Sequence, residues 1–227
     1  MDRPSAEATA PIPAGDFSSW LAEIQGALRG DNDSDVACGT CTACCTASQF
    51  IHISPDERDA LAHIPTALLF AAPRMPPGHV LMGYDQHGRC PMLIDNRCSI
   101  YEHRPRTCRT YDCRVLPAAG LHIDADDRDK VLIAQRARRW EFSHPTEIDT
   151  RHHHAVERAA RFLIEHRRDL SPGVVPQAAT PIAVAAIEIH DLFIDGADSC
   201  EAGETGAAGA AGDDTVDVTA VELRLRR

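Results

Sequence analysis

The chain has 227 residues, 44% of them hydrophobic, and a formal net charge of −11 at pH 7. This length can bury a substantial core and suits one domain with extensions. The negative charge belongs to the two ends, since residues 1–37 carry 2 basic and 7 acidic groups and residues 171–227 carry 3 and 10. The charge therefore favours solubility and does not indicate a surface for nucleic acid.

No membrane span and no targeting segment are expected. The sequence has no run of eighteen apolar residues, and residues 1–15 lack the apolar core of a signal peptide. We therefore expect a cytoplasmic protein, because clustered cysteines in a reducing compartment are more often metal ligands than disulfides. A secreted disulfide scaffold is the alternative, and the missing signal counts against it.

The N-terminal part is predicted to contain one helix. Residues 1–15 are expected to be disordered, and the helix spans residues 16–28 before an acidic linker that ends at residue 35. The helix is indicated by apolar residues that recur on one face. These are Phe17, Trp20, Leu21, Ile24 and Leu28.

The middle part, residues 36–115, is predicted to mix short helices and strands. Ser54 to Glu57 has the pattern of a helix start, with a serine cap, a proline at the first position and a glutamate three residues after the serine. In chain order we expect a helix at 54–64, a strand at 79–85, its return strand at 90–94, a turn at 95–97 and a short helix at 106–111.

The C-terminal part is predicted to be a helical extension over residues 116–195, followed by a tail over residues 196–227. Within the extension, helices are expected at 124–142, 145–170 and 181–194. The tail begins with a flexible Gly/Ala/acidic stretch. Its last residues, 215–226, alternate in hydrophobicity and are interpreted as an edge strand.

Eight of the nine cysteines lie within 76 residues of the middle part. The first four read C-x2-C-x2-C-C, a spacing that lets thiolates converge on one metal. The candidate metal ligands are Cys38, Cys41, Cys44, Cys45, Cys90, Cys98, Cys108 and Cys113.

The metal and its nuclearity stay open at this point. Cys44 and Cys45 are adjacent, so their side chains should diverge and face two centres. Eight thiolates suit two zinc sites, a binuclear site, or one [4Fe–4S] cluster with four spare thiols. The C-x2-C-x2-C run has the local spacing of iron–sulfur ligands. Only the gap from Cys108 to Cys113 in the second group suits a short zinc unit, which favours an iron cluster.

Two arginines are candidates for holding the charge of such a centre. Arg104 and Arg109 alternate with the cysteines of the second group, and four thiolates around zinc leave a net negative charge. The alternative is ordinary ion pairing or stacking on tyrosine. Cys108 is expected in the first turn of its helix, where the helix dipole should lower its pKa.

Histidine sites are weaker candidates. His153 and Glu157 are spaced to share a helix face, but the zinc motif H-E-x-x-H is not formed at His152–His154, so a solvated helix is favoured. Three further histidines lie near the cysteines and would each more often be surface residues, namely His52, His87 and His103. Cys200 in the tail is interpreted as a free thiol. No nucleotide-binding or serine hydrolase motif is present.

The cysteine pattern resembles the YkgJ-type cysteine-cluster family, a group described as zinc- or iron-chelating. The matching pieces are the C-x2-C-x2-C-C run, the C-P-x-L of residues 90–93, and the C-x-I-Y-x-x-R-P and C-R-x-Y-x-C patterns that follow from residue 98. The resemblance implies a bound zinc or iron ion or an iron–sulfur cluster. Some relatives, among them a flagellin lysine N-methylase, resemble enzymes that use such a centre.

We therefore expect an α+β fold, with a small metal-stabilised cysteine domain packed by flanking helices. Three functions remain open: a redox or protein-modifying iron–sulfur protein, a zinc-stabilised interaction module, and a protein of metal storage or delivery. The expected partners are the metal and another protein, with no nucleic acid and no membrane.

Overall fold

The computed structural model describes residues 10–34, 36, 39–123, 127–194 and 216–226. These residues form an α+β fold of short strands and several helices, as the sequence predicts. They belong to two compact units. The helical unit comprises the described parts of Met1–Gln25, Cys113–His122 and Ala137–Arg227, and the cysteine unit comprises those of Gly26–Asp112 and Ile123–Arg136.

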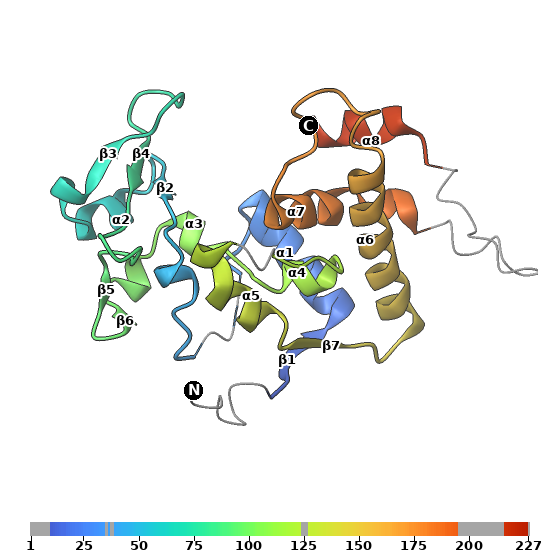
Figure 1. The fold of residues 1–227 in the computed structure, drawn as a ribbon, viewed down its shortest axis with the longest axis horizontal. Helices are drawn as coiled ribbons and strands as arrows, with labels where there is room; N and C mark the ends of the chain where they lie inside the picture. Colours follow the sequence, from blue (N-terminus) through green and yellow to red (C-terminus); the bar gives the residue numbers. More distant parts are fainter. Residues whose placement is uncertain (1–9, 35, 37–38, 124–126, 195–215, 227) are drawn as a thin grey trace, which may run out of the picture. The chain divides into compact units, whose positions relative to one another are not determined.

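Two strands of the helical unit pair in parallel, although they are far apart in the sequence. They are β1 (Ile12–Asp16) and β7 (Trp140–Ser143), which lie side by side in Figure 1. Two expectations are therefore wrong, because residues 12–15 are not disordered and the 124–142 segment is not one helix. Backbone groups that are removed from water need hydrogen-bond partners, and the pairing of β1 with β7 supplies them. Local propensity alone did not predict this pairing, because the two strands are far apart in the sequence.

Helix α1 (Phe17–Arg29) follows β1 directly and confirms the first predicted helix. Its apolar face is the buried one, since Trp20, Leu21 and Ile24 are each exposed by no more than 2%. Phe17 is fully buried and packs edge-on against Phe142 of β7, with ring centroids 5.0 Å apart. The 3.6-residue apolar period thus anchors α1 in the core of the helical unit.

Helix α6 (Glu147–Glu165) begins with a reciprocal cap. The Thr146 hydroxyl accepts a hydrogen bond from the N–H of Asp149 at 3.3 Å, and the Asp149 carboxylate accepts one from the Thr146 N–H at 3.0 Å. Asp149 also accepts from the N–H of Ser18 at 2.9 Å, which joins the starts of α6 and α1. These donors hold the pKa of the buried Asp149 well below its usual range.

The remaining helices of this unit pack on α6 or on α7. Helix α7 (Ala179–Ile189) and the 3-10 helix His190–Phe193 contact it, as Figure 1 shows for α7, and the short α4 (Val115–Ala118) lies against both α6 and α7. Helix α8 (Val218–Leu225) packs on α7 with its Val221 fully buried.

Helix α8 corrects the prediction of an edge strand at 215–226. Asp217 precedes the helix, and its carboxylate accepts a hydrogen bond from the N–H of Thr219 at 2.9 Å. This cap, together with burial of one face, outweighs the alternating pattern. The flexible stretch expected at 196–214 and the free thiol expected at Cys200 lie outside the described residues.

The cysteine unit is built on a three-stranded antiparallel sheet with the order β2-β4-β3. The strands are β2 (Ile51–Ile53), β3 (Leu69–Ala71) and β4 (Val80–Met82). Strand β4 confirms the strand predicted at 79–85, but residues 90–94 are not its return strand, since both of its edges are already paired with β2 and β3.

Part of the 90–94 segment, which was predicted to pair with the strand at 79–85, instead belongs to a separate hairpin. Strand β5 (Leu93–Ile94) pairs with β6 (Arg97–Cys98) across a two-residue turn. The turn residues Asp95 and Asn96 have positive φ angles of 48° and 59°, which is the conformation of tight hairpin turns. The turn predicted at 95–97 is thus confirmed, and it connects a different pair of strands.

Short helices complete the cysteine unit. They are α2 (Arg58–His63), the 3-10 helices Thr66–Leu68, Tyr101–His103 and Arg128–Lys130, α3 (Arg106–Arg109) and α5 (Val131–Ala137). Helix α2 starts later than predicted, because Ser54 to Glu57 forms a turn in which the Glu57 carboxylate accepts from the Ser54 N–H at 2.9 Å.

The apolar core of the cysteine unit is small. Among the described residues its buried cluster consists of Ile53, Ile64, Met82, Met92 and Ile100. Cys90 and Cys98 are partly buried and pack against this cluster. The core therefore adjoins the cysteines directly.

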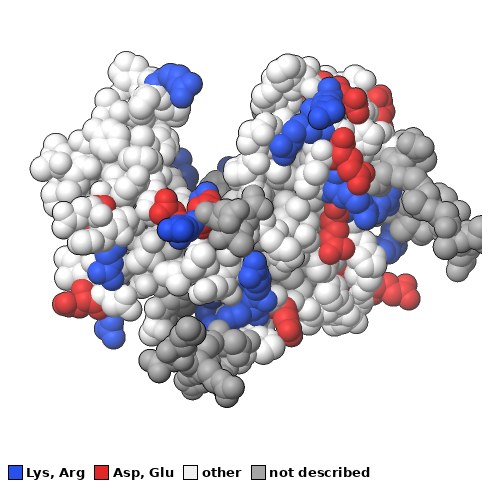
Figure 2. All heavy atoms as spheres, in the orientation of Figure 1, with Lys and Arg blue, Asp and Glu red and all other residues white. Residues whose placement is uncertain are grey.

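The described surface carries both signs of charge. On the face shown in Figure 2, acidic and basic side chains are interspersed over the helical unit. In the described part of the chain, every helix is too short or too polar to span a bilayer.

Substitution of Asp149 tests the junction of α1 and α6. We expect Asp149→Ala to lower the thermal midpoint by a few degrees, because the N–H groups of Ser18 and Thr146 lose their acceptor. Glu147→Ala is the control, since Glu147 is in the same helical turn but exposed.

The same variant should show a pH dependence. Folding lowers the pKa of Asp149, so its contribution to stability is complete above the ordinary pKa of about 3.9 and is lost as the pH falls toward the depressed value. The difference in thermal midpoint between wild type and Asp149→Ala should therefore narrow below about pH 4. A difference that does not change with pH would contradict this role.

Candidate metal centre

The described cysteines lie on loops and element ends rather than within strands or long helices. Cys41 precedes the 3-10 helix Cys44–Thr46, which contains Cys44 and Cys45. The others are Cys90 in the loop that follows β4, Cys98 at the end of β6, Cys108 in α3, and Cys113 just before α4. Cys38 lies outside the described residues.

A backbone connection brings the first cysteine segment to the second. The N–H of Cys90 donates to the carbonyl of Cys45 at 2.7 Å, and the N–H of Ser48 donates to the carbonyl of Gly88 at 3.0 Å. Gly88 has a φ of 74°, and a Cβ at this position would lie 2.4 Å from the Ser48 hydroxyl oxygen. The positive φ therefore favours a glycine at this position.

The turn before Cys90 is organised by one carboxylate. Asp85 accepts hydrogen bonds from the N–H groups of His87 at 2.8 Å and Arg89 at 2.9 Å. This turn places Cys90 next to the segment that contains Cys45.

Cys44 and Cys45 hydrogen-bond to each other through their sulfur atoms. This contact lowers the pKa of Cys44 to about 7 and raises that of Cys45, because one thiol holds the proton that the other accepts. The two sulfur atoms therefore lie close to each other, although neighbouring Cα–Cβ bonds diverge. The expectation that the pair faces two centres stays a prediction.

Three further thiols belong to the same network of electrostatic interactions. Cys90 and Cys108 each act on Cys45, and Cys44 and Cys98 act on both Cys90 and Cys108. We call these five residues the thiol group. Ionised sulfur atoms at this density repel one another, so they favour a bound cation.

Burial opposes ionisation of the second cysteine segment. It raises the pKa of Cys90, although backbone N–H groups of Met92 and Leu93 point at the sulfur and favour the thiolate. The C-P-x-L sequence thus supplies two N–H donors to its own cysteine. Burial and the neighbouring thiols also raise the pKa of Cys108 to about 12. The expected lowering by the helix dipole is wrong, because α3 has four residues and a correspondingly small dipole.

Arg104 is the arginine that acts on the thiol group. Its charge lowers the pKa of Cys44 and of Cys108. The guanidinium carbon lies 3.6 Å from the centroid of the Tyr101 ring, so the stacking alternative is also realised. Its Nε is buried and has no hydrogen-bond partner among the described residues. A buried cationic donor beside several thiols suits an anionic centre.

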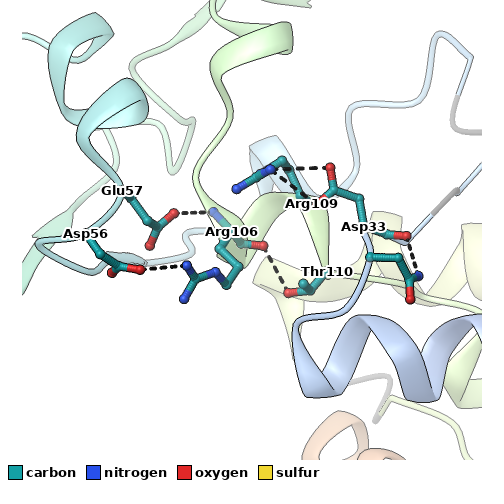
Figure 3. Close-up of polar contacts among 7 residues, drawn as sticks. Asp33, Asp56, Glu57, Arg106, Arg109 and Thr110 are labelled. Atoms are coloured by element: carbon teal, nitrogen blue, oxygen red, sulfur yellow. Dashed lines mark hydrogen bonds and ion pairs between the residues drawn. The ribbon is translucent and has the colours of Figure 1, made fainter.

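Arg109 has a different role. Its Nη1 lies 3.3 Å from Oδ1 of Asp33, so its charge pairs with the acidic linker that precedes the cysteines. Figure 3 shows this ion pair together with the contacts of Arg106, whose guanidinium donates to Asp56 at 2.8 Å and whose N–H donates to Glu57. Both arginines therefore brace α3, the helix that contains Cys108.

Cys113 belongs to the helical unit, unlike the thiol group. It is buried, and the indole N–H of Trp140 donates to its sulfur at 3.2 Å. Trp140 lies on β7, so this contact depends on the strand pairing that sequence reasoning missed. An indole donor can stabilise either a thiol or a thiolate acceptor.

Of the three histidines of α6, His152 and His153 are partly buried and His154 is exposed. His153 stacks on Phe17 with ring centroids 4.2 Å apart, and its Nδ1 lies 2.8 Å from Nε2 of His144. Burial lowers the pKa of His153, and Glu157 is 4.0 Å away. The preference for a solvated helix is wrong for His153, because α1 covers this part of α6.

The histidines near the cysteines differ in their partners. Nε2 of His52 lies 2.9 Å from Nδ1 of His79, and His87 is exposed. His103 contacts Asp59 and His63, two residues that sequence reasoning did not consider. Asp59 and His63 are four residues apart on the helix predicted at 54–64, and this spacing could have indicated that they share one helix face.

The donor set of the thiol group fits zinc or iron. Thiolates are soft ligands that select these metals over calcium or magnesium. The backbone donors to Cys90 and the buried Nε of Arg104 suit the charge of a thiolate-bound centre.

Comparison with known proteins supports the same metals. A family model described as "CxxCxxCC: Putative zinc- or iron-chelating domain" matches residues 37–137. No curated protein and no solved structure matches the chain. The matched segment includes the whole thiol group and Arg104. The family description supports metal binding by this segment, which is similar to that domain over residues 37–137.

Proposed function

We propose that the thiol group, with Cys38 and Cys41 from the same first run, ligates an iron–sulfur cluster that stabilises the cysteine unit. The observation that carries this proposal is the mutual interaction of five thiols on four separate segments of one unit. A mononuclear structural zinc site uses four ligands, so five interacting thiols favour a centre with more than one metal atom.

Cys113 is left out of the proposed ligand set. Its sulfur accepts the hydrogen bond from Trp140, and it belongs to the helical unit. Arg104 is proposed to hold the charge of the centre, and Arg109 to position α3 through Asp33. Six of the described cysteines are free thiols, which fits a reducing compartment such as the cytoplasm; they are Cys41, Cys44, Cys45, Cys90, Cys98 and Cys108.

Structural zinc is the second candidate function. It is supported by the small apolar core, whose five buried residues adjoin Cys90 and Cys98. Small units with few buried residues commonly depend on a metal for stability. In that case the cysteine unit would serve as an interaction module, and no redox role would follow.

Cysteine substitution tests which thiols bind the metal. We expect Cys90→Ser to lose bound metal and to unfold the cysteine unit, because structural thiolate–metal binding contributes on the order of 10 kcal/mol to folding. Cys113→Ser is the matched control and should retain the full metal content. Metal analysis and thermal unfolding of both variants check this, and equal loss of metal would place Cys113 among the ligands.

Anaerobic purification tests the identity of the metal. We expect a brown protein that contains acid-labile sulfide and bleaches with dithionite, since iron–sulfur clusters absorb in the visible range and accept electrons. A colourless anaerobic preparation with stoichiometric zinc and no sulfide would overturn the iron–sulfur proposal and support the zinc candidate.

The two arginines should differ in their effect on the centre. We expect Arg104→Ala to increase metal loss to a chelator by roughly 10–100-fold, the range typical of groups that support metal ligands. Arg109→Ala is the matched control. It should have a smaller effect, because its charge pairs with Asp33 near the surface. Equal chelator sensitivity of the two variants would count against a role for Arg104 at the centre.

A further inference from the structure

A cluster of two histidines and one aspartate lies in the cysteine unit. Asp59 and His63 are on α2, and His103 ends the 3-10 helix Tyr101–His103. One ligand atom from each residue, an imidazole nitrogen or a carboxylate oxygen, lies within 4.8 Å of the other two. Nitrogen and oxygen ligands around one ion have separations in this range.

The three side chains already contact one another, but the two rings must turn relative to each other to ligate one ion, because a ligating imidazole holds the ion in its own ring plane. The two imidazole rings stack with centroids 3.5 Å apart and planes 4° from parallel. Nδ1 of His103 lies 2.9 Å from Oδ2 of Asp59, and Nδ1 of His63 lies 3.6 Å from Oδ1. Both rings therefore turn the same nitrogen toward one carboxylate.

The protonation of the rings follows from their partners. Nδ1 of His63 also lies 2.9 Å from the backbone carbonyl oxygen of Asp59, which can only accept, so this nitrogen carries the proton. The Asp59 carboxylate accepts in the same way from His103. The hydrogen bond from His103 lowers the pKa of Asp59, so the carboxylate stays ionised.

We propose that Asp59, His63 and His103 form a second metal site, for one divalent first-row transition ion of the zinc class. The ion replaces the protons between the imidazole Nδ1 atoms and the carboxylate, and each neutral ring takes its proton on Nε2 instead. Two imidazoles and one carboxylate suit borderline metals such as Zn²⁺ rather than the soft thiolate centre. Three protein ligands leave coordination positions for water.

The surroundings fit an accessible site of this kind. The side chains of Asp59, His63 and His103 are 69%, 41% and 39% exposed, so an ion can enter without opening the core. Arg109 acts on Asp59, but its own charge pairs with Asp33. The site is separate from the thiol group in its residues and in its ligand chemistry.

Titration of the full-length protein, purified with its cysteine centre loaded, tests this proposal. We expect one equivalent of added Zn²⁺ to bind in calorimetry and to raise the thermal midpoint. His103→Ala should weaken this binding at least about tenfold. His87→Ala is the matched control, because His87 is an exposed histidine of the same unit whose ring contacts Gln86. It should bind Zn²⁺ like the wild type.

A second variant and a second probe distinguish this site from metal binding at the thiols or at scattered surface groups. Asp59→Asn keeps the shape of the side chain while removing its charge, and it should also weaken Zn²⁺ binding. With Co²⁺ as the probe, the wild type should show weak visible bands without a thiolate charge-transfer band. Equal binding by wild type, His103→Ala and Asp59→Asn would overturn the proposal, as would a thiolate charge-transfer band that accounts for all bound Co²⁺.

Discussion

The electrostatic interaction among five cysteines is the constraint on which the cysteine unit depends. The hydrogen bond from the Cys90 N–H to the Cys45 carbonyl, at 2.7 Å, joins two segments that are 45 residues apart. It places Cys90 beside a pair of thiols that already share one proton. Several ionised sulfur atoms in one partly buried place are costly without a cation, since each loses hydration and repels its neighbours. A metal relieves both effects, which is why metal binding and folding should be linked in this unit.

The charged residues around the thiols divide into two kinds. Arg104 acts on the sulfur atoms directly, whereas Arg109 and Arg106 connect α3 to acidic residues on other segments. The charge of Arg104 shifts the pKa values of the thiols. The ion pairs of Arg106 and Arg109 hold the backbone of α3, which contains the candidate ligand Cys108. The same unit also contains the Asp59, His63 and His103 cluster, whose nitrogen and oxygen atoms suit a different metal class. Two ligand chemistries in one small unit would allow it to hold two kinds of ion.

Local pattern was sufficient for much of the secondary structure. The apolar stripe of α1 and the acidic start of α6 are properties of consecutive residues, so the sequence reports them directly. The turn at Asp95 and Asn96 follows from residues that tolerate positive φ. The cysteine spacing likewise predicted metal binding, because ligand type and ligand density are readable without coordinates.

The sequence by itself therefore determined the fold class, the positions of the main helices and the chemistry of the candidate ligands. Only the tertiary structure decided which thiols meet. The Cys44–Cys45 contact depends on side-chain rotation, the Cys113–Trp140 contact on the pairing of β1 with β7, and the approach of His103 to Asp59 on the packing of two short helices. Two of these contacts join residues that are far apart in the chain, and the third depends on side-chain rotamers. A local sequence pattern specifies neither long-range pairing nor rotamers.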